Sequence, residues 1–464
     1  MNIIPNNYIN VLKNMIISNF SNNLEQELNK IDSNPTVFNY INLLSSLDKS
    51  LCKIAKESLI TIFEAIDRGY RNSYDRKRKY HIKAHHTRSL MTIFGEITFK
   101  RTFYSDKHNK GSFCYLDWFL GLNKYDYFDP YIKALVIDYS TKYSFQKTGS
   151  LISEMIGNRI NLSKDCLLSR QIVRNIILKS VMPIPKCEPI NDVDSIYIMA
   201  DEKFIHTQRN NKKDAMIKSI VVFDKINNDG NRIKLINKMI FSNYSGSIVD
   251  NVLDYIYKVY NTDKIKNIYY MGDGAGWIKN IKNYFKFTTN TNVIFGLDKF
   301  HFKQALHHIC QNELLEYNAT TYILNDDKQT FKELCTNLII SYPHRQKTIL
   351  EKETYILNNW QYILNSYNNN LRCCMESNIS HNIADLFTSR PKAYSLKMID
   401  KLMEHRMLYK NNYNLKKLYL NNHNNKEQII IDLENINYSI FDMYHKDTKP
   451  KLPKLPTIAL SYKY

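Results

Sequence analysis

The order of strand and helix patterns in its middle third restricts the fold of this chain more than any other feature. Ile196, Ile198 and Ala200 recur at every second position, as the side chains of a half-buried strand over 195–206 do. Seven further segments have strand or helix periodicity. In order, they are strands 217–223 and 232–241, which flank the NNDGN turn at 227–231, helix 248–260, strand 268–271, helix 276–284, strand 293–297 and helix 300–313. Three hairpin-linked strands followed by alternating helices and strands predict an α/β domain with a ribonuclease-H-like mixed sheet.

Two aspartates stand at the ends of strands in this framework. Asp201 lies toward the end of the first strand, and Asp273 directly follows the fourth strand in YYMGDGAGW, where three glycines allow a sharp turn. Neighbouring parallel strands place such residues side by side, and two close carboxylates repel each other unless a cation lies between them. Hard oxygen ligands suit Mg²⁺ or Mn²⁺, and two such ions roughly 4 Å apart can promote phosphodiester displacement. In the alternative interpretation, Asp201 caps a structural element and Asp273 only makes a turn.

A third carboxylate is expected on a helix after the last strand, and spacing alone does not choose it. The candidates are Glu313, Glu333, Glu351, Glu353, Glu376 and Glu404. Asp298 and His301 form a DxxH pattern at the end of the fifth strand, on the same expected sheet edge. That position suits residues that orient substrate or support the metal ligands.

The charge of the chain predicts a polyanionic partner. With 64 Lys+Arg against 45 Asp+Glu, the formal net charge is +19, and nucleic acids are the abundant cellular polyanions. Codon bias in an AT-rich genome offers an alternative source of lysine, but such a bias spreads charge evenly. Between Asp75 and Lys110, ten Lys and Arg residues stand against three acids, a local +7. We therefore expect this segment to contact DNA.

The same basic segment has the pattern of a β-hairpin. Leu90, Thr92 and Phe94 alternate before Gly95-Glu96, and Ile97 and Phe99 alternate after it. Its histidines, His81, His85 and His86, are interpreted as part of the basic face, because no Cys or carboxylate completes a metal set with them. The phosphate contacts predicted here are Arg76, Lys77, Arg78, Lys79, Arg88, Lys100 and Arg101.

Helical patterns lie on both sides of the hairpin. An apolar stripe from Leu51 to Ile66 predicts a helix ended by Gly69. Two short patterns then follow: 145–157, and a second helix capped by Ser163, joined by a turn at Gly157-Asn158. They fit either a helix-turn-helix or two helices of a plain helical domain; in the first case the second helix presents Arg170, Gln171 and Arg174 to a major groove. The proline cluster at 181–190 predicts a linker.

Most of the chain resembles the DDE transposases of the ISLre-two insertion-sequence family, long catalogued as an uncharacterised bacterial protein family. The resemblance rests on seven segments: YHIKAHHTRSLMTIFGEITFKRTFY, YLDWFLGLNKYDYFDPYI, SFQKTGSLI, YIMADEKFIHTQ, YYMGDGAGWIK, LDKFHFKQAL and ESNISHNIADLFTSRP. This chain has Ser377-Asn378 where the family has Gly-His, and its TSRPKAYS segment differs from the family's usual ending.

The resemblance implies a metal-dependent transposase acting on double-stranded DNA. By similarity, Asp201, Asp273 and Glu376 are the three catalytic acids that hold two Mg²⁺ or Mn²⁺ ions, and Asp298 and His301 match a supporting DxxH. The protein would bind the element's terminal inverted repeats and target DNA, and would form a homo-oligomer to synapse two ends. The alternatives are a ribonuclease-H-like nuclease that only hydrolyses DNA, and a decayed transposase that only binds it.

The resemblance also implies a mostly helical insertion before Glu376, in which Trp360 is expected to pack between helices rather than stack on a flipped base.

No apolar run approaches the roughly 18 residues of a membrane helix, and the start lacks a signal-peptide pattern, so we expect a cytoplasmic, nucleoid-associated protein with no membrane partner. The eight cysteines contain no CxxC pair, which argues against a thiolate zinc site. The expected division is 1–74 helical, 75–130 basic hairpin, 131–180 candidate helix-turn-helix, 190–410 catalytic with the insertion at about 318–370, and 411–464 C-terminal helix and tail.

Overall fold

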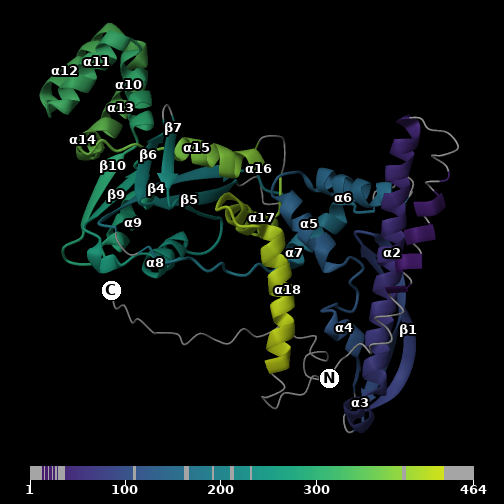
Figure 1. Ribbon diagram of the computed structural model, residues 1–464. Coiled ribbons are helices and arrows are strands. Elements are labelled where there is room, and N and C mark those ends of the chain that lie inside the picture. Colours follow the sequence, from purple (N-terminus) through teal and green to yellow (C-terminus); the bar gives the residue numbers. More distant parts are fainter. Residues whose placement is uncertain are drawn as a thin grey trace.

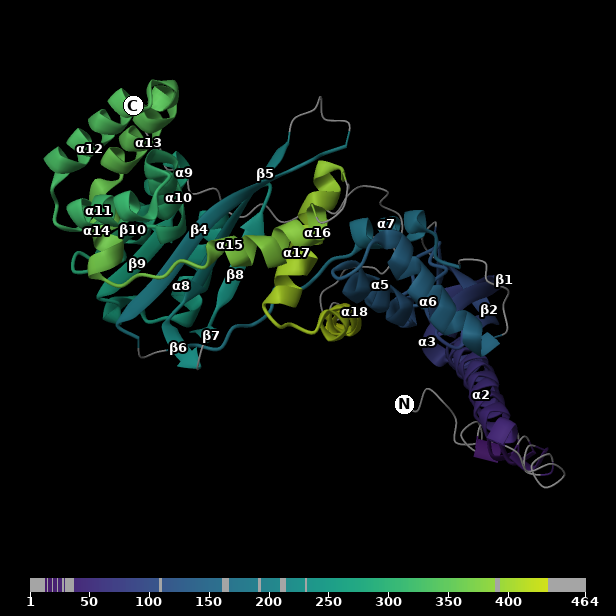
Figure 2. The ribbon, with the colours of Figure 1, turned by 90° about the horizontal axis from the view of Figure 1, so that it is seen from above.

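The computed structural model shows three groups of elements in a row, with a long helix and a hairpin at one end and a sheet with a helical lobe at the other (Figures 1 and 2). It describes residues 37–107, 111–160, 167–190, 193–208, 214–229, 232–388 and 393–432, and isolated positions between 13 and 29. The architecture is mixed α/β, as the sequence predicts. The boundaries expected between domains stay a prediction.

The N-terminal group packs a long helix against a twisted hairpin. It contains α2 (Val37–Asn72), α3 (Tyr74–Lys79), β1 (Tyr80–Thr92), β2 (Gly95–Asp106), β3 (Ser112–Cys114) and α4 (Tyr115–Phe119). The predicted hairpin is confirmed, but Thr92 pairs with Gly95, so the turn lies at Ile93-Phe94 and not at Gly95-Glu96. The predicted stop at Gly69 is wrong because α2 continues to Asn72. A glycine inside a helix costs only about 1 kcal/mol, which packing of the apolar stripe outweighs.

A middle group of helices joins segments that precede and follow the sheet in the sequence (Figure 2). It contains α5 (Pro130–Ser140), α6 (Phe145–Ile160), α7 (Arg170–Lys179), α17 (Leu396–Lys410) and α18 (Leu415–Asp432). The turn predicted at Gly157-Asn158 is wrong because α6 continues to Ile160, and Ser163 lies outside the described residues. Helix α7 begins after Ser169, whose hydroxyl accepts a hydrogen bond from the Ile172 N–H.

The central sheet has the order β10-β9-β4-β5-β8. Its strands are β4 (Ser195–Ile205), β5 (Ala215–Phe223), β8 (Met239–Asn243), β9 (Asn267–Gly272) and β10 (Asn292–Leu297). Strand β5 runs antiparallel to β4 and β8, whereas β4, β9 and β10 are parallel. The proline-containing segment before β4 has no helix and makes one bridge, between Ile190 and Tyr260.

The prediction of a single third strand over 232–241 is wrong, because this segment contributes to two separate strands. Strand β7 (Arg232–Ile236) pairs with β6 (Lys225–Asp229) in a separate two-stranded sheet, and only β8 joins the main sheet. Asn237 separates β7 from β8 with a φ of 52°, and its side chain donates to Asp224 at 2.6 Å. A left-handed residue cannot continue a strand.

Helices cover both faces of the main sheet. Alternation along β4 sends Ile196, Ile198 and Ala200 into the core formed with α8 (Ile248–Val259) and α9 (Gly276–Ile281). Met199 faces the opposite core, which includes residues of α15 (Met375–Ile379) and α17. Single 3₁₀ turns, η1 (Thr262–Lys264) and η2 (Lys282–Phe285), follow α8 and α9. The predicted alternation of the first strand is confirmed.

A helical lobe follows β10. It is formed by α10 (Lys299–Cys310), α11 (Glu313–Leu324), α12 (Lys328–Ser341), the turn η3 (Pro343–Arg345), α13 (Gln346–Asn358) and α14 (Trp360–Asn368). Trp360 is 3% exposed and its indole N–H donates to Asp326 at 2.5 Å, so it packs in the lobe as predicted. The chain then returns to the sheet through α15, the π-helical turn η4 (Ser380–Ala384) and α16 (Asp385–Phe387). No helix in the described ranges is long and apolar enough to cross a membrane.

Candidate active site

The first two predicted acids lie at matching positions on neighbouring strands. The pairing of β4 with β9 ends at Met199 and Met271, and Asp201 and Asp273 each follow two residues later. Because the two strands are parallel, both aspartates reach the same edge of the sheet. The structure therefore brings together the two residues that strand order and glycine content singled out.

A tight glycine-containing loop holds Asp273. A Cβ atom on Gly272 would lie 3.0 Å from the carbonyl oxygen of Ala200, so β9 and β4 are closely packed here. Gly274 has a φ of 86°, which favours glycine. Oδ1 of Asp273 accepts a hydrogen bond from the Ala275 N–H at 2.8 Å. The loop thus fixes the carboxylate immediately after the strand.

Asp298 and His301 join this cluster from the next strand. Leu297 pairs with Gly272, and the Asp298 N–H donates to the Gly272 carbonyl at 2.8 Å, so Asp298 lies beside the Asp273 loop. The Asp298 carboxylate caps α10 by accepting from the Phe300 N–H at 3.0 Å. Asp298 is buried, whereas His301 in the first turn of α10 is half-buried.

Electrostatics in the cluster disfavour several negative charges at once. Burial raises the pKa of Asp201 to about 6; the Glu202 N–H at 2.7 Å lowers this pKa, and the charge of Asp273 raises it further. Burial also raises the pKa of Asp298, and His301 lowers the pKa of both carboxyl groups. A cation between Asp201 and Asp273 would relieve their repulsion, so this donor pair fits a hard divalent ion.

Glu376 is not part of the cluster in this structure. It lies in the first turn of α15, and its side chain is exposed. The helix itself is close to the site, because the Cys374 N–H contacts the Met199 sulfur on β4 at 3.4 Å. Within the described ranges, no three His, Cys, Asp or Glu side chains are grouped so that they could hold a metal ion. Asp201, Asp273, Asp298 and His301 thus lie near enough to influence one another's charge, but three of them do not close around one ion, and the predicted third acid lies apart.

Arg406 fixes the segment that follows Glu376. From α17, its guanidinium donates to the carbonyls of His381 and Asn382 in η4 and to that of Thr141 after α5, and it pairs with Asp385 at 2.7 Å. A π-helical turn leaves carbonyls without their usual α-helical donors. Arg406 thus holds the end of the Glu376 segment against the middle group of helices.

Sequence reasoning missed several neighbours of the acids. The Trp277 indole N–H donates to the Glu202 carboxylate, and the Lys218 ammonium lies 5.1 Å from the centre of the Trp277 ring. Cys373 hydrogen-bonds Asp298, and burial raises the pKa of its thiol well above the ordinary value. Of these neighbours, only Glu202 could have been found from the sequence, because it is adjacent to Asp201. The other contacts join segments that are far apart in the chain.

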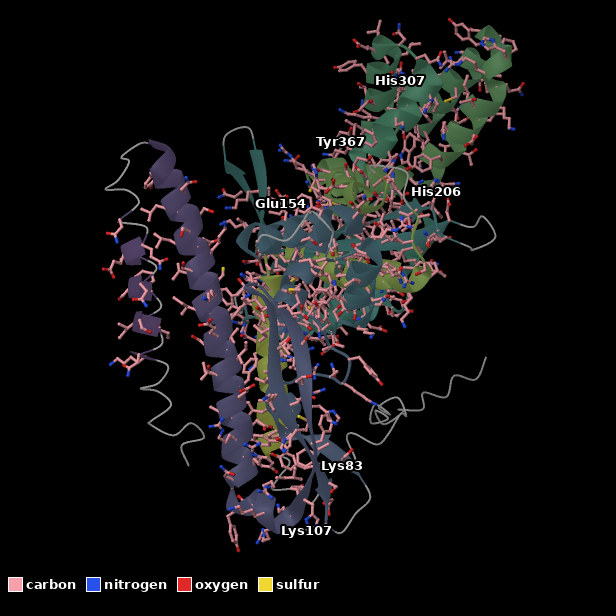
Figure 3. All side chains as sticks on the ribbon, turned by 90° about the vertical axis from the view of Figure 1, so that its right-hand side faces the viewer. Lys83, Lys107, Glu154, His206, His307 and Tyr367 are labelled. Carbon is pink, nitrogen blue, oxygen red and sulfur yellow. The ribbon has the colours of Figure 1, made fainter. Side chains whose placement is uncertain are left out.

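Part of the predicted DNA-binding set lies at the surface. Lys77, Arg78 and Lys79 are exposed on α3, and Lys100 is exposed on β2. Arg76 is half-buried and donates to the Arg71 carbonyl. Lys83 and Lys107 also lie at this end of the molecule, opposite the lobe that carries His307 (Figure 3). On α7, Arg170 is exposed and Arg174 is half-buried.

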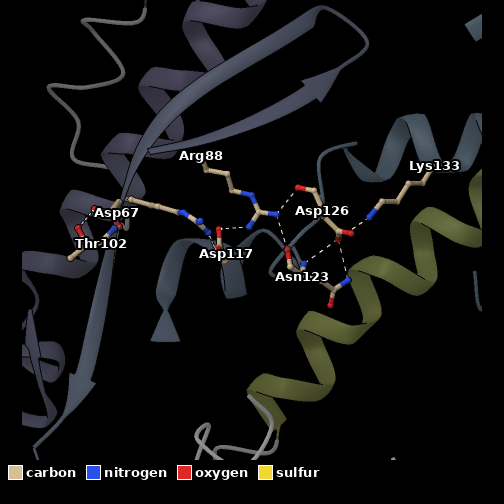
Figure 4. Close-up of polar contacts among 8 residues, drawn as sticks. Asp67, Arg88, Thr102, Asp117, Asn123, Asp126 and Lys133 are labelled. Carbon is tan, nitrogen blue, oxygen red and sulfur yellow. Dashed lines mark hydrogen bonds and ion pairs between the residues drawn. The ribbon is translucent and has the colours of Figure 1, made fainter. Parts of the chain in front are cut away.

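Two predicted phosphate contacts, Arg88 and Arg101, are used inside the fold instead. Both pair with Asp117, and Arg88 also donates to the carbonyls of Asn123 and Asp126 at 2.7 and 2.8 Å (Figure 4). The Arg88 side chain is 5% exposed. A buried guanidinium that is paired with a carboxylate cannot reach a phosphate, so these two residues do not belong to a DNA-binding surface.

The comparisons place the chain in a family. The profile of the uncharacterised protein family UPF0236 matches residues 35–424, and the chain belongs to this family. Two relatives come from Caldanaerobacter subterraneus subsp. tengcongensis. One, whose name joins eleven gene designations beginning with TTE0033, is 22% identical over 96% of this chain and 92% of its own length. UPF0236 protein TTE2489 is 24% identical over 90% of this chain and 87% of its own length.

Proposed function

We propose that this protein is a DNA transposase of a bacterial insertion sequence, which cleaves the ends of its element and joins them to target DNA. The observation that carries the proposal is the convergence of Asp201 and Asp273 at one sheet edge, where burial and mutual repulsion favour a bound cation. Metal-bound carboxylate pairs of this kind suit phosphodiester chemistry.

The strand order supports the proposal. Antiparallel β5 and then β8, which runs in the same direction as β4, lie on one side of β4, and parallel β9 and β10 lie on the other. This is the arrangement expected of a ribonuclease-H-like sheet. Asp201 then lies on the central strand, and Asp273 and Asp298 follow the next two strands in space. An active site at the carboxyl ends of parallel strands is the general rule for open α/β sheets.

The chain's own residues would bind and orient the DNA. Asp201 and Asp273 would hold Mg²⁺ or Mn²⁺, which when bound would activate a water or 3′-hydroxyl and stabilise the leaving oxygen. Asp298 and His301 would position the scissile strand beside the two aspartates. The exposed cations of α3 would neutralise phosphates of the terminal repeats.

The names of relatives give independent support. One UPF0236 protein carries eleven gene designations of a single strain, and another carries four. A protein encoded many times in one genome is what repeated transposition produces. We infer that this chain acts on the inverted repeats that flank its own gene, in the nucleoid and as a homo-oligomer that synapses two ends.

Strand cleavage and joining test the proposal. Labelled duplexes that carry the sequences flanking the gene are incubated with the full chain and Mg²⁺ or Mn²⁺, and nicked and joined products are separated on denaturing gels. Asp201→Asn and Asp273→Asn should lose at least about 100-fold in rate, because each removes a carboxylate charge that would hold the metal ion. Asp254→Asn changes an exposed acid on α8, away from the strand ends, and should act like the parent. Equal cleavage by all variants would refute the assignment.

The products separate the related activities. Joined products support a transposase, whereas nicked products without joining support a nuclease of the same fold. A second candidate, a protein that binds repeats but does not cut, is favoured by the exposed position of Glu376 and by Ser377-Asn378. Sequence-specific binding with a steep salt dependence and no cleavage in either metal would establish that function.

A further inference from the structure

We propose that the helical lobe positions the second acid of the site, and that Tyr355 and Asn359 are the residues through which it does so. Tyr355 lies in the last turn of α13 and Asn359 directly follows this helix, more than eighty residues after Asp273 in sequence. The consequence for catalysis rests on the proposed function, but the restraint on the loop can be tested without it.

The first contact is a hydrogen bond to the acid's own backbone. The hydroxyl of Tyr355 donates to the carbonyl oxygen of Asp273 at 2.8 Å. Burial of the Tyr355 ring raises the pKa of the hydroxyl, so it stays a donor across the physiological range. A partly buried hydrogen bond of this kind resists rotation of the peptide that follows Asp273.

The second contact closes the loop from the other side. The amide nitrogen of Asn359 donates to the Tyr355 carbonyl at 2.8 Å, which directs its Oδ1 toward the loop. A Cβ atom on Gly274 would lie 2.8 Å from this oxygen, so the glycine and the amide are in close contact. Asn359 is 3% exposed and its Oδ1 has no hydrogen-bond partner among the described residues. Burial of an unpaired acceptor costs free energy, so its retention next to the acid loop suggests a role there.

The lobe does not need these contacts to dock on the sheet. Helix α14 already lies along the edge strand β10, where Ser366 donates to the Leu297 carbonyl at 2.6 Å and Asn365 to the Phe295 carbonyl at 2.9 Å. That interaction covers an exposed strand edge and fixes the lobe. The Tyr355 hydroxyl and the Asn359 Oδ1 make additional contacts, and these are directed at the Asp273 loop.

Hydrogen exchange measured by mass spectrometry tests the restraint in the full chain. In Tyr355→Phe, which keeps the ring but removes the donor, peptides covering 272–276 should exchange about three- to tenfold faster, the change expected for one lost hydrogen bond. Tyr322→Phe is the matched control, since Tyr322 is a half-buried tyrosine of α11 in the core of the same lobe. It should leave exchange of 272–276 unchanged. Asn359→Leu, which fills the same volume, gives a second variant of the contact.

Calorimetric titration with Mn²⁺ alone, together with the cleavage assay, tests the purpose of the restraint. Tyr355→Phe should bind Mn²⁺ about three- to tenfold more weakly than the parent and Tyr322→Phe. Unchanged exchange of 272–276 in both Tyr355→Phe and Asn359→Leu would overturn the inference, even if the parent cleaves DNA. Faster exchange with unchanged Mn²⁺ affinity and cleavage would also overturn it, because the lobe would then restrain the loop without serving the acid. If the parent neither binds Mn²⁺ nor cuts, the proposed function fails, and the exchange result still decides whether the lobe restrains the loop.

Discussion

Asp201 and Asp273 occupy equivalent positions just beyond the parallel pairing of β4 with β9, each two residues after the last paired methionine. This equivalence holds two carboxylates in mutual repulsion at one sheet edge. Ionisation of Asp201 costs additional free energy, because its carboxyl group is largely removed from solvent. Folding stability should therefore depend on the charge of Asp201.

The stability of the chain should fall as Asp201 ionises. Its folded pKa is raised to about 6 from an ordinary value near 3.8, so the folded state holds the proton more tightly than the unfolded state. The associated stability is present below pH 4 and is lost as the pH rises through 6. After allowance for solvent screening we expect a loss of about 1 to 2 kcal/mol. Urea unfolding at pH 5 and pH 7 should show a smaller difference in Asp201→Asn than in the parent; an identical pH dependence in both would contradict the raised pKa.

Substitution by alanine should change the stability of the fold differently at Gly274 and at Gly276. Gly274 has a φ of 86° and a Cβ there meets Asn359, so Gly274→Ala should destabilise the fold by about 1 to 3 kcal/mol. Gly276 begins α9 and a Cβ there meets nothing within 4 Å, so Gly276→Ala should be neutral or slightly stabilising. Thermal unfolding of both variants measures the difference. Equal melting temperatures would mean that the loop is not held in the observed conformation.

Substitution of Arg88 should affect the stability of the fold, whereas substitution of Arg78 should affect only DNA binding. Arg88→Ala removes a buried partner of Asp117 and should cost about 3 kcal/mol of stability. Arg78→Ala changes an exposed side chain and should leave stability unchanged. If Arg78 contacts a phosphate, its loss should reduce the slope of log affinity against log salt by about 0.9. Unfolding curves and salt titrations on duplex DNA check both expectations, and a stable Arg88→Ala protein would contradict the buried role.

Buried His405 should make the chain sensitive to acid. Burial lowers its pKa to about 3, and its Nε2 lies 3.0 Å from the hydroxyl of Ser180, which directly follows α7. The unfolded histidine takes a proton near pH 6.5, so the stability is fully present above 6.5 and is lost as the pH falls toward 3. The expected loss is about 1.4 kcal/mol per pH unit below 6.5. Unfolding between pH 5 and pH 7 should be less pH-dependent in His405→Gln; an equal dependence would show that the imidazole is not buried neutral.

The elements of the sheet were predictable from local periodicity. Apolar alternation identified β4, and the glycines around Asp273 marked the end of β9. The division of 232–241 into two strands was not predictable, because it depends on the left-handed Asn237 and its bond to Asp224. The extension of α2 past Gly69 was also missed, since packing against the hairpin outweighs the local preference of glycine.

The candidate site was predictable only in part. Asp201 lies in β4, and Asp273, Asp298 and His301 follow the neighbouring strands β9 and β10, so strand order and spacing bring the four residues together. The side-chain environment of Glu376 depends on how α15 packs on β4 and on the π-helical turn that Arg406 holds, and no local pattern reports either.

The sequence by itself determined the mixed sheet, the acids at its edge and the basic hairpin, because each follows from periodicity, glycine placement or charge within a short segment. Only the tertiary structure decided which charges are available. It buried Arg88 and Arg101 against Asp117 and brought Tyr355 and Asn359 to the Asp273 loop. The reason is physical: the free energy of a charge or a polar group depends on its partners and its exposure to water, and those are set by segments distant in the chain.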